Sequence, residues 1–223
     1  MPGYQTKTVA ATVAGRLYTL CVLADNQQFA DADGAGERAG VSSATWPLFG
    51  QLWPAGCVLA EHMATQDVAG KRIIEIGCGM ALASLVLHSL GADVTASDHH
   101  PLTADFLARN CALNDLPSLP YLDAHWDRPD GALGLFDVII ASDVLYERGH
   151  ADSIAAFIER HAAPTADVVI SDPGRGNAAA MMRLLRALDF VGDEQRVAMG
   201  INVEPPFRGR LLSFRRIASV AAH

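Results

Sequence analysis

The chain has 223 residues, of which half are hydrophobic and 19% are charged, and its formal net charge is −8 at pH 7. This balance excludes a disordered chain and predicts one globular domain with a substantial core. No apolar run approaches the roughly 20 residues that cross a bilayer, and the negative charge argues against a nucleic-acid partner, whose phosphates require clustered Lys and Arg.

The expected compartment follows from the N-terminus and the cysteines. The first residues lack a basic segment followed by an apolar core, so we expect a cytoplasmic protein without membrane association. The four cysteines are scattered without a C-x-x-C pair, which predicts reduced thiols rather than disulfides or a metal centre.

Two β-rich runs open the chain. They cover Thr6–Val13 and Arg16–Leu23, and Ala14-Gly15 between them favours a β-hairpin. We expect the hairpin and the loop after it to form an N-terminal extension (residues 1–45) before the main domain (residues 46–223).

A polar, glycine-rich loop is predicted over residues 25–43. Its Asp31-Ala32-Asp33-Gly34 fragment resembles the start of a calcium-binding loop. The glutamate that completes such a loop is not at its place, so we interpret the stretch as an ordinary loop. An aromatic, proline-rich segment follows over residues 46–54, and Pro54 is placed to open a helix that ends near Met63.

A glycine-rich turn follows the next apolar strand. The run Arg72–Ile76 passes into Gly77-Cys78-Gly79 and then into an apolar segment over residues 81–90, which predicts a strand, a tight loop and a helix. The two glycines permit positive φ and carry no Cβ, so a ligand can approach the backbone, and free N–H groups at the start of the helix would help to bind it. Such a loop suits a nucleotide-like ligand, although dinucleotide folds and chance turns use it too.

The following strand, Asp93–Asp98, ends in an acidic residue. In a βαβ unit this places Asp98 at the carboxyl edge beside the glycine loop, where its carboxylate can accept both hydroxyl hydrogens of a ribose. An aspartate that only closes a strand is the alternative. Leu82 stands where a dinucleotide fold has its third glycine, which weakens a nicotinamide-cofactor hypothesis.

Glu75-Ile76-Gly77-Cys78-Gly79, together with Asp98, resembles the cofactor-binding half of the class I, seven-stranded S-adenosylmethionine-dependent methyltransferases. The resemblance implies an α/β fold, with a Rossmann-like, mostly parallel sheet of seven strands and helices on both faces. It implies S-adenosyl-L-methionine as the cofactor and S-adenosyl-L-homocysteine as its product. The residues that it assigns to the cofactor are Glu75, Gly77, Cys78, Gly79 and Asp98.

Three further side chains are candidates for the walls of the donor site. Trp53 resembles the tryptophan of a Trp-Pro segment in the protein lysine methyltransferases related to those that act on chaperones and electron-transfer flavoprotein. His99 is a candidate wall of the ribose pocket, while the pair His99-His100 lacks a third ligand for a metal. Trp126 follows a strand predicted over residues 119–122, and a tryptophan at this place in the family lines the adenine pocket.

The acceptor side is predicted from the loop after the central strand. Phe136–Ser142 is nearly continuous in apolar residues, as expected of a parallel strand covered on both faces. It leads to Asp143 and Tyr146 at the carboxyl edge, where ligands bind in open α/β sheets. The same D-x-x-Y pattern follows the fourth strand in the lysine methyltransferase branch. We assign Ser142 to the cofactor and the other two residues to the acceptor; a helix-capping aspartate and a core tyrosine are the alternative.

The remaining elements complete the sheet. We predict helices over residues 101–114, 151–162 and 177–188, a strand over residues 167–172, and an antiparallel pair over residues 196–201 and 210–219 joined through Pro205-Pro206. The Asp172-Pro173-Gly174-Arg175 turn resembles one in the electron-transfer flavoprotein β-subunit lysine methyltransferases. A wall of the target channel and a turn with a solvated arginine are equally supported interpretations.

Together these residues predict an S-adenosylmethionine-dependent N-methyltransferase that acts on a lysine side chain of a protein. The sulfonium donor is already activated, so the enzyme has to align the reactants, exclude water and admit a neutral amine, with no metal. Asp143 would accept an N–H hydrogen bond from the amine, and Tyr146 would wall the channel or donate to a carbonyl. A small-molecule N-methyltransferase and a nucleotide-binding protein without transferase activity are the alternatives.

Overall fold

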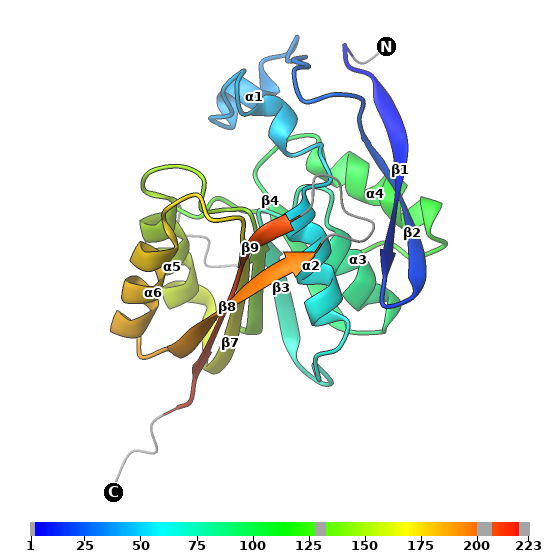
Figure 1. Cartoon of the computed structure of the whole chain (residues 1–223). Coiled ribbons are helices and arrows are strands. Elements are labelled where there is room, and N and C mark those ends of the chain that lie inside the picture. Colours follow the sequence, from blue (N-terminus) through cyan, green and yellow to red (C-terminus); the bar gives the residue numbers. More distant parts are fainter. Residues whose placement is uncertain (1–2, 128–132, 200–206, 219–223) are drawn as a thin grey trace, which may run out of the picture.

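The architecture is one mixed sheet with helices on both faces and a separate hairpin beside it (Figure 1). The computed structural model describes residues 3–127, 133–199 and 207–218. The strands are Thr6–Val13 (β1), Arg16–Leu23 (β2), Arg72–Ile76 (β3), Asp93–Asp98 (β4), Tyr121–Asp123 (β5), Phe136–Ser142 (β6), Ala162–Asp172 (β7), Val191–Met199 (β8) and Phe207–Arg216 (β9). The helices are Ala35–Arg38 (α1), Pro54–Met63 (α2), Leu82–Ser89 (α3), Thr103–Leu113 (α4), His150–His161 (α5) and Ala178–Ala187 (α6), and Trp46–Leu48 is a short 3-10 helix. None of the described helices has the length and apolar character needed to span a bilayer.

The seven strands of the sheet lie in the order β5-β4-β3-β6-β7-β9-β8. The strands from β3 to β7 pair in parallel, whereas β9 is antiparallel to both β7 and β8. The predicted seven-stranded, mostly parallel fold is therefore confirmed. The chain fills one side of β3 first and then crosses to the other side through β6, so the strand order reverses next to β3. Ligands in open α/β sheets bind in the crevice at such a reversal, outside the carboxyl ends of the strands.

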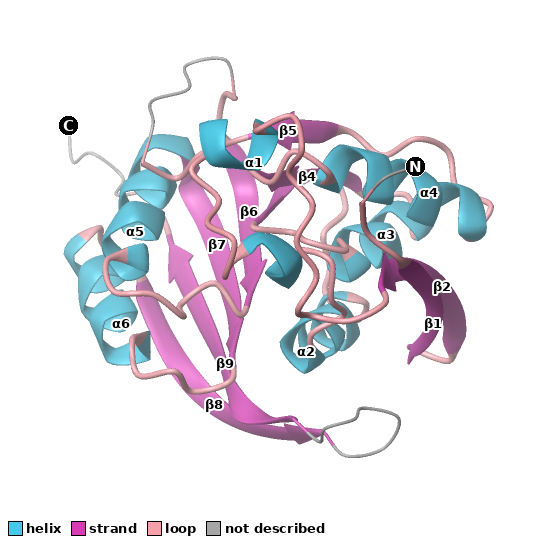
Figure 2. Ribbon diagram, turned by 90° about the horizontal axis from the view of Figure 1, so that it is seen from above, coloured by secondary structure: helices cyan, strands magenta, loops and turns pink. Residues whose placement is uncertain are grey.

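Alternate residues of the central strands belong to two separate cores, because successive side chains of a strand point to opposite faces. Ile73, Val138 and Ile140 pack with α2, α3 and α4, while Ile74 and Ile139 pack with α5 and α6. Figure 2 shows these two helical layers on either side of the sheet. Burial on both faces explains why the central strands are continuous in apolar residues and were predicted at nearly the observed positions.

The hairpin docks on α4 through two asparagine side chains. Asn114 donates from its amide nitrogen to the Thr19 carbonyl (2.8 Å) and accepts the Thr19 N–H on its amide oxygen (2.9 Å). Asn110 accepts the N–H of Cys21 at 2.8 Å. The two amides thus pair with β2 as a neighbouring strand would, and they occupy backbone groups that an open edge would leave free.

The loop predicted over residues 25–43 contains a short helix, α1, which the sequence analysis missed. The helix forms because both carboxylate oxygens of Asp31 accept backbone N–H groups, one from Gly36 (2.8 Å) and one from Glu37 (2.9 Å). The aspartate that resembled a calcium ligand therefore caps a helix. Four residues without an apolar stripe carry no helical periodicity, so the pattern gave no signal.

Three strands near the C-terminus, β7, β8 and β9, begin earlier than predicted, and β9 begins at Phe207 instead of Arg210. β7 starts at Ala162, since this residue already pairs with Phe136 across an irregularity in the ladder. β8 starts at Val191, since it pairs with β9 as far as Arg215. Pro164 and Thr165 interrupt the apolar pattern at the start of β7, and Asp193 and Glu194 interrupt it at the start of β8. The predicted connection through Pro205-Pro206 lies outside the described residues.

Asn114→Ala should lower the free energy of unfolding by about 1–3 kcal/mol, because it leaves the Thr19 N–H and carbonyl without partners in a half-buried position. Urea unfolding followed by tryptophan fluorescence measures the change. Gln66→Ala is the matched control, since that amide bonds within its own turn at His62 and Thr65, and it should change stability by less than about 0.5 kcal/mol. Equal stability of Asn114→Ala and the parent would show that the hairpin does not depend on this contact.

Candidate functional site

A cavity of about 390 Å³ lies at the carboxyl edge of the sheet, where β3, β4 and β6 end. This volume is typical of small-molecule sites. The structure brings together around it all the residues that the sequence predicted for the site: Trp53, Glu75, Gly77, Cys78, Gly79, Asp98, His99, Trp126, Ser142, Asp143 and Tyr146. Residues 39–41, from the predicted N-terminal extension, also line the cavity, so the extension contributes to the site.

The glycine loop is packed closely from two sides. Gly77 has φ 59°, and a Cβ atom there would lie 2.8 Å from the Trp126 ring and 3.0 Å from Val144. Gly79 has φ 51°, and its Cβ would lie 2.9 Å from the Phe49 carbonyl oxygen. Both positions therefore require glycine for the packing of the protein itself, before any ligand is considered.

Glu75 holds the helix that follows the loop. Its side chain is buried, and Oε2 accepts hydrogen bonds from the Ser84 backbone N–H (2.9 Å) and the Ser84 hydroxyl (2.5 Å). Burial raises the pKa of Glu75 to about 7, with a smaller contribution from the charge of Asp98 and against the effect of the two hydrogen bonds. Our expectation of free N–H groups at the start of α3 was wrong for Ser84, because its N–H already donates to Glu75 of the preceding strand.

Cys78 contributes its backbone rather than its thiol. Its N–H donates to the Ser97 carbonyl at 3.0 Å, while the side chain is buried in the core. Burial raises the pKa of the Cys78 thiol well above its usual value, so the thiol stays protonated. In the described part of the chain, no three His, Cys, Asp or Glu side chains are grouped to hold a metal ion.

Asp98 links the end of β4 to the glycine loop. Its Oδ2 accepts the N–H of Gly79 and its Oδ1 accepts the N–H of His100, both at 2.9 Å. A carboxylate oxygen can accept two hydrogen bonds, so each oxygen keeps one acceptor position for a ligand hydroxyl. His99 is partly exposed beside it, with Nδ1 3.8 Å from Oδ1.

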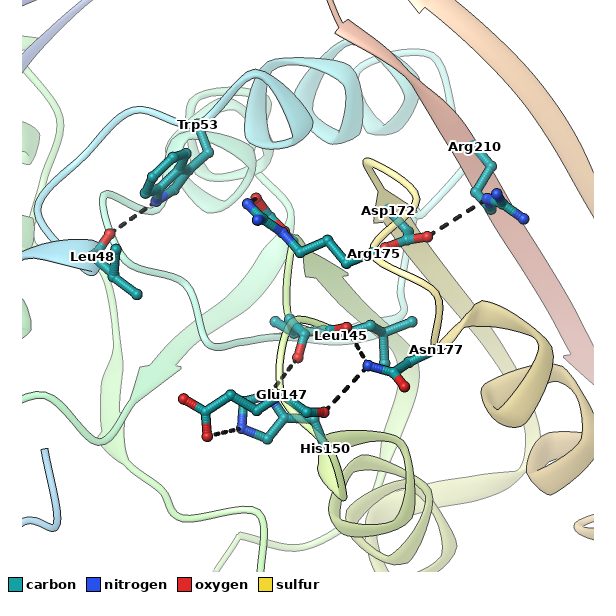
Figure 3. A network of polar contacts seen from close by, with 11 residues as sticks. Leu48, Trp53, Leu145, Glu147, His150, Asp172, Arg175, Asn177 and Arg210 are labelled. Carbon is teal, nitrogen blue, oxygen red and sulfur yellow. Dashed lines mark hydrogen bonds and ion pairs between the residues drawn. The ribbon is translucent and has the colours of Figure 1, made fainter. Parts of the chain in front are cut away.

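Aromatic rings wall the cavity on two sides. Trp53 is held by a 2.9 Å hydrogen bond from its indole N–H to a backbone carbonyl (Figure 3). On the other side, the ring of His150 meets Trp126 and Tyr146 edge to face, at centroid distances of 5.2 and 4.7 Å. His150 also donates from Nδ1 to the Val144 carbonyl at 2.8 Å, which sets the direction of the ring. These contacts make a continuous surface between the predicted adenine wall and the predicted acceptor residues.

Asp143 is engaged by an arginine from a neighbouring loop. Its two carboxylate oxygens accept hydrogen bonds from Nε (2.7 Å) and Nη2 (2.8 Å) of Arg175, and this contact raises the pKa of the arginine. The Asp143 backbone has φ 53°, which is uncommon for a residue with a side chain, and its N–H donates to the Ser171 carbonyl at 2.8 Å. Burial, with a smaller contribution from the charge of Glu147, raises the pKa of Tyr146 to about 12, although the residue is 37% exposed.

Sequence reasoning missed His150 and residues 39–41, and left the role of Arg175 open. His150 is the first residue of α5, four positions after Tyr146, and this position was the available signal, because the start of a helix after a parallel strand faces the carboxyl edge. Residues 39–41 belong to a glycine-rich loop without periodicity, so no local pattern places them at the cavity. The position of Arg175 depends on how the loops after β6 and β7 meet.

The chain resembles known proteins over most of its length. A family described as lysine methyltransferase matches residues 44–182. The electron transfer flavoprotein beta subunit lysine methyltransferase of Danio rerio is 29% identical over 135 residues, which are 58% of this chain and 51% of the relative. The histone-arginine methyltransferase METTL23 of Homo sapiens is 32% identical over 114 residues, 48% of this chain and 60% of the relative. The chain thus spans only 51–60% of the length of these curated relatives.

Solved structures share the fold at low identity. A 16S rRNA methyltransferase of T. Thermophilus, in complex with AdoMet and guanosine, superposes with a TM-score of 0.64 at 18% identity, over 95% of this chain and 50% of that one. The magnesium protoporphyrin IX methyltransferase of Synechocystis, with bound SAM, superposes with a TM-score of 0.54 at 18% identity, over 73% and 77%. At such identities the likeness concerns the fold alone.

Glu75 should make stability depend on pH. Its folded-state pKa of about 7 lies above the ordinary value of 4.5, so the folded protein keeps a proton that the unfolded chain loses between these values. The contribution is present below pH 4.5 and is lost as the pH rises to about 7, on the order of 3 kcal/mol in all. Urea unfolding of the parent and of Glu75→Gln should be measured from about pH 5 to about pH 8. The free energy of unfolding of the variant should increase relative to that of the parent as the pH rises.

The comparison with the variant is needed because His100 acts in the opposite sense. Burial lowers the pKa of His100 to about 3, so its contribution to stability is lost as the pH falls. Because both proteins carry His100, its effect cancels in the difference between their free energies of unfolding. A stability difference that stays constant across the range would contradict the assigned titration of Glu75.

Proposed function

The chain belongs to the lysine methyltransferase family, and we propose that it transfers a methyl group from S-adenosylmethionine to the side-chain nitrogen of a lysine in a protein. The observation that carries the proposal is that the glycine loop with Asp98 lines the same cavity as Asp143 and Tyr146. A donor held by the first set and an acceptor held by the second would meet directly. The names of the curated relatives, methyltransferases of protein lysines or arginines, support the reaction class.

The residues present fit the donor. Gly77 and Gly79 line the cavity and carry no side chains of their own that would keep a ligand from the backbone. Asp98 keeps two acceptor positions, which is the number that the two hydroxyls of a ribose require. Trp126 offers an apolar ring for the adenine, and Trp53 closes the cavity from the side of α2. S-adenosylmethionine supplies a methyl group on a positively charged sulfur, which departs as a neutral thioether.

The residues of the chain contribute to the transfer by aligning the acceptor nitrogen with the methyl donor. A displacement at carbon requires the nitrogen lone pair in line with the departing sulfur, and holding two reactants in such a geometry is worth several orders of magnitude in rate. Asp143 would orient the amine by accepting one of its N–H groups. Tyr146 stays protonated at neutral pH, so its hydroxyl can donate to a carbonyl of the acceptor. The two tryptophans exclude water from the reacting atoms.

The rim of the cavity suits a side chain that enters from a protein surface. Tyr146 is 37% exposed, and the Glu147 side chain beside it is 52% exposed. Both can contact residues around a target lysine, whereas a free amine would leave them in water. Lysine is favoured over arginine as the acceptor because the family description and the electron transfer flavoprotein relative name lysine. A small-molecule amine and nucleotide binding without transfer are the rival functions.

Asp98→Ala should weaken binding of S-adenosylhomocysteine about thirtyfold, roughly 2 kcal/mol, because it removes charge-assisted hydrogen bonds to the ribose. Calorimetric titration measures the affinity. Asp123→Ala, at the exposed end of the neighbouring strand β5, is the matched control and should bind like the parent. Thermal unfolding separates lost binding from lost folding, because Asp98 also bonds Gly79. Unchanged affinity in a folded Asp98→Ala protein would remove this residue from the donor site.

Incubation with labelled S-adenosylmethionine and an extract of the source cells should place the label on a lysine of a protein. Label on a small molecule alone would favour the first rival, and no label at all would favour the second. With the acceptor identified, Asp143→Asn should lower the single-turnover rate about 100-fold and leave S-adenosylhomocysteine affinity within about threefold. Loss of donor affinity with an unchanged rate at saturating donor would place Asp143 in the donor site instead.

A further inference from the structure

The carboxylate that would receive the acceptor already holds a cation. Both oxygens of Asp143 are bound by Arg175, in a two-point contact that matches the planar guanidinium to the carboxylate. We propose that Arg175 is the internal counter-ion of the acceptor site, which a cationic acceptor side chain replaces, and that Arg175 thereby selects acceptors that carry a positive charge. The inference rests on the proposed function, because it assigns Asp143 to the acceptor.

The two partners differ in their access to solvent. The Asp143 side chain is 8% exposed, whereas the Arg175 side chain is 44% exposed. Figure 3 shows Arg175 extending away from Asp172 and Arg210, toward the side of the view where Trp53 lies. The arginine thus covers a carboxylate that is otherwise buried at the cavity wall, and an incoming cation meets the guanidinium first.

The loop of Arg175 is built to turn between two fixed ends. Gly174 and Gly176 flank the arginine with φ 92° and 100°, and a Cβ at Gly176 would meet nothing within 4 Å. On the N-terminal side of this loop, Asp172 ends β7 and is fully buried. On its C-terminal side, the Asn177 side chain donates to the carbonyls of the loop after β6 (Figure 3). Rotation about the glycine backbones can therefore withdraw the arginine without moving either end.

Charge balance makes the exchange selective. An ammonium that displaces the guanidinium keeps Asp143 paired while the acceptor binds, and the ammonium then loses a proton to solvent so that the neutral nitrogen can attack the methyl group. A neutral side chain that displaced it would leave an unpaired, mostly buried charge, which is strongly unfavourable. The pair itself is open to exchange, because one partner is partly exposed and ion pairs in contact with water are weak. A lysine or arginine residue fits this requirement, whereas an amide or a hydroxyl does not.

The test measures binding rather than transfer. The probes are Nα-acetyl-lysine-N-methylamide and its uncharged norleucine counterpart, titrated by NMR into full-length protein saturated with S-adenosylhomocysteine. Arg175→Met keeps the apolar stem and removes the competing charge. If Arg175 is bound to Asp143 in about nine-tenths of the parent molecules, the variant should bind the lysine probe about tenfold more tightly than the parent does. The norleucine probe should bind the variant and the parent with equal affinity. A further Asp143→Asn change in the same chain should abolish the gain.

A second arginine provides the matched control. Arg215 makes the same two-point contact with Asp167, at 2.5 and 3.2 Å, in the interior of β7 rather than at its carboxyl end. Arg215→Met should bind both probes like the parent. Arg175→Lys keeps the positive charge but loses the planar guanidinium that donates to both carboxylate oxygens. It should therefore bind the lysine probe with an affinity between those of the parent and Arg175→Met. Thermal unfolding of each variant confirms that the folded protein is compared.

Several results would overturn the inference. The absence of a gain for the lysine probe in folded Arg175→Met, including no binding at all, would show that the arginine does not compete for the site. An equal gain for the norleucine probe would show that Arg175 acts by bulk rather than by charge. Tighter lysine binding without methyl transfer to any protein would contradict the proposed function and support the counter-ion role, so the two failures are distinguishable.

Discussion

The close approach of separate chain segments around the glycine loop after β3 is the contact on which the rest of the site depends. The backbone at Gly77 lies against the Trp126 ring and Val144, and the backbone at Gly79 lies against the Phe49 carbonyl. Only a hydrogen atom fits on the α-carbon at either place. The segment before α2, the loop after β5 and the loop after β6 are therefore positioned against one short turn. Because a packed interior leaves little freedom, their relative places set the shape of the cavity.

Two buried carboxylates hold this turn, one from each of two neighbouring strands. The Glu75 side chain reaches the start of α3, where Ser84 donates two hydrogen bonds to it. Asp98 binds the N–H of Gly79 and keeps acceptor positions for a ligand. Burial makes each charged carboxylate costly, and the backbone N–H groups that donate to them offset part of that cost. Similar side chains at adjacent strand ends thus have different contacts: one holds the start of α3, and the other holds the glycine loop and has the proposed role in donor binding.

The acceptor half of the site is constructed differently from the donor half. Its loops follow β6 and β7 and are tied to each other by the Asn177 side chain and by the hydrogen bond from the Asp143 N–H to Ser171. At its rim the charged side chains of Glu147 and Arg175 are about half exposed. A buried donor half and an open acceptor half suit a reaction in which the donor is always the same and the acceptor arrives on another molecule.

Local sequence patterns determined the fold and identified residues that line the proposed donor half of the cavity. Strands buried on both faces must be rich in apolar residues, and a turn such as Gly77-Cys78-Gly79 has local chemistry, so β3 and β6 were predicted closely. The tertiary structure alone decided that Asn114 pairs with the hairpin, that Glu75 turns to α3, and that Arg175 occupies Asp143. Each of these contacts depends on the direction of a side chain and on which loops meet at the sheet edge. Residues far apart in the chain make them, and no periodicity along the sequence encodes them.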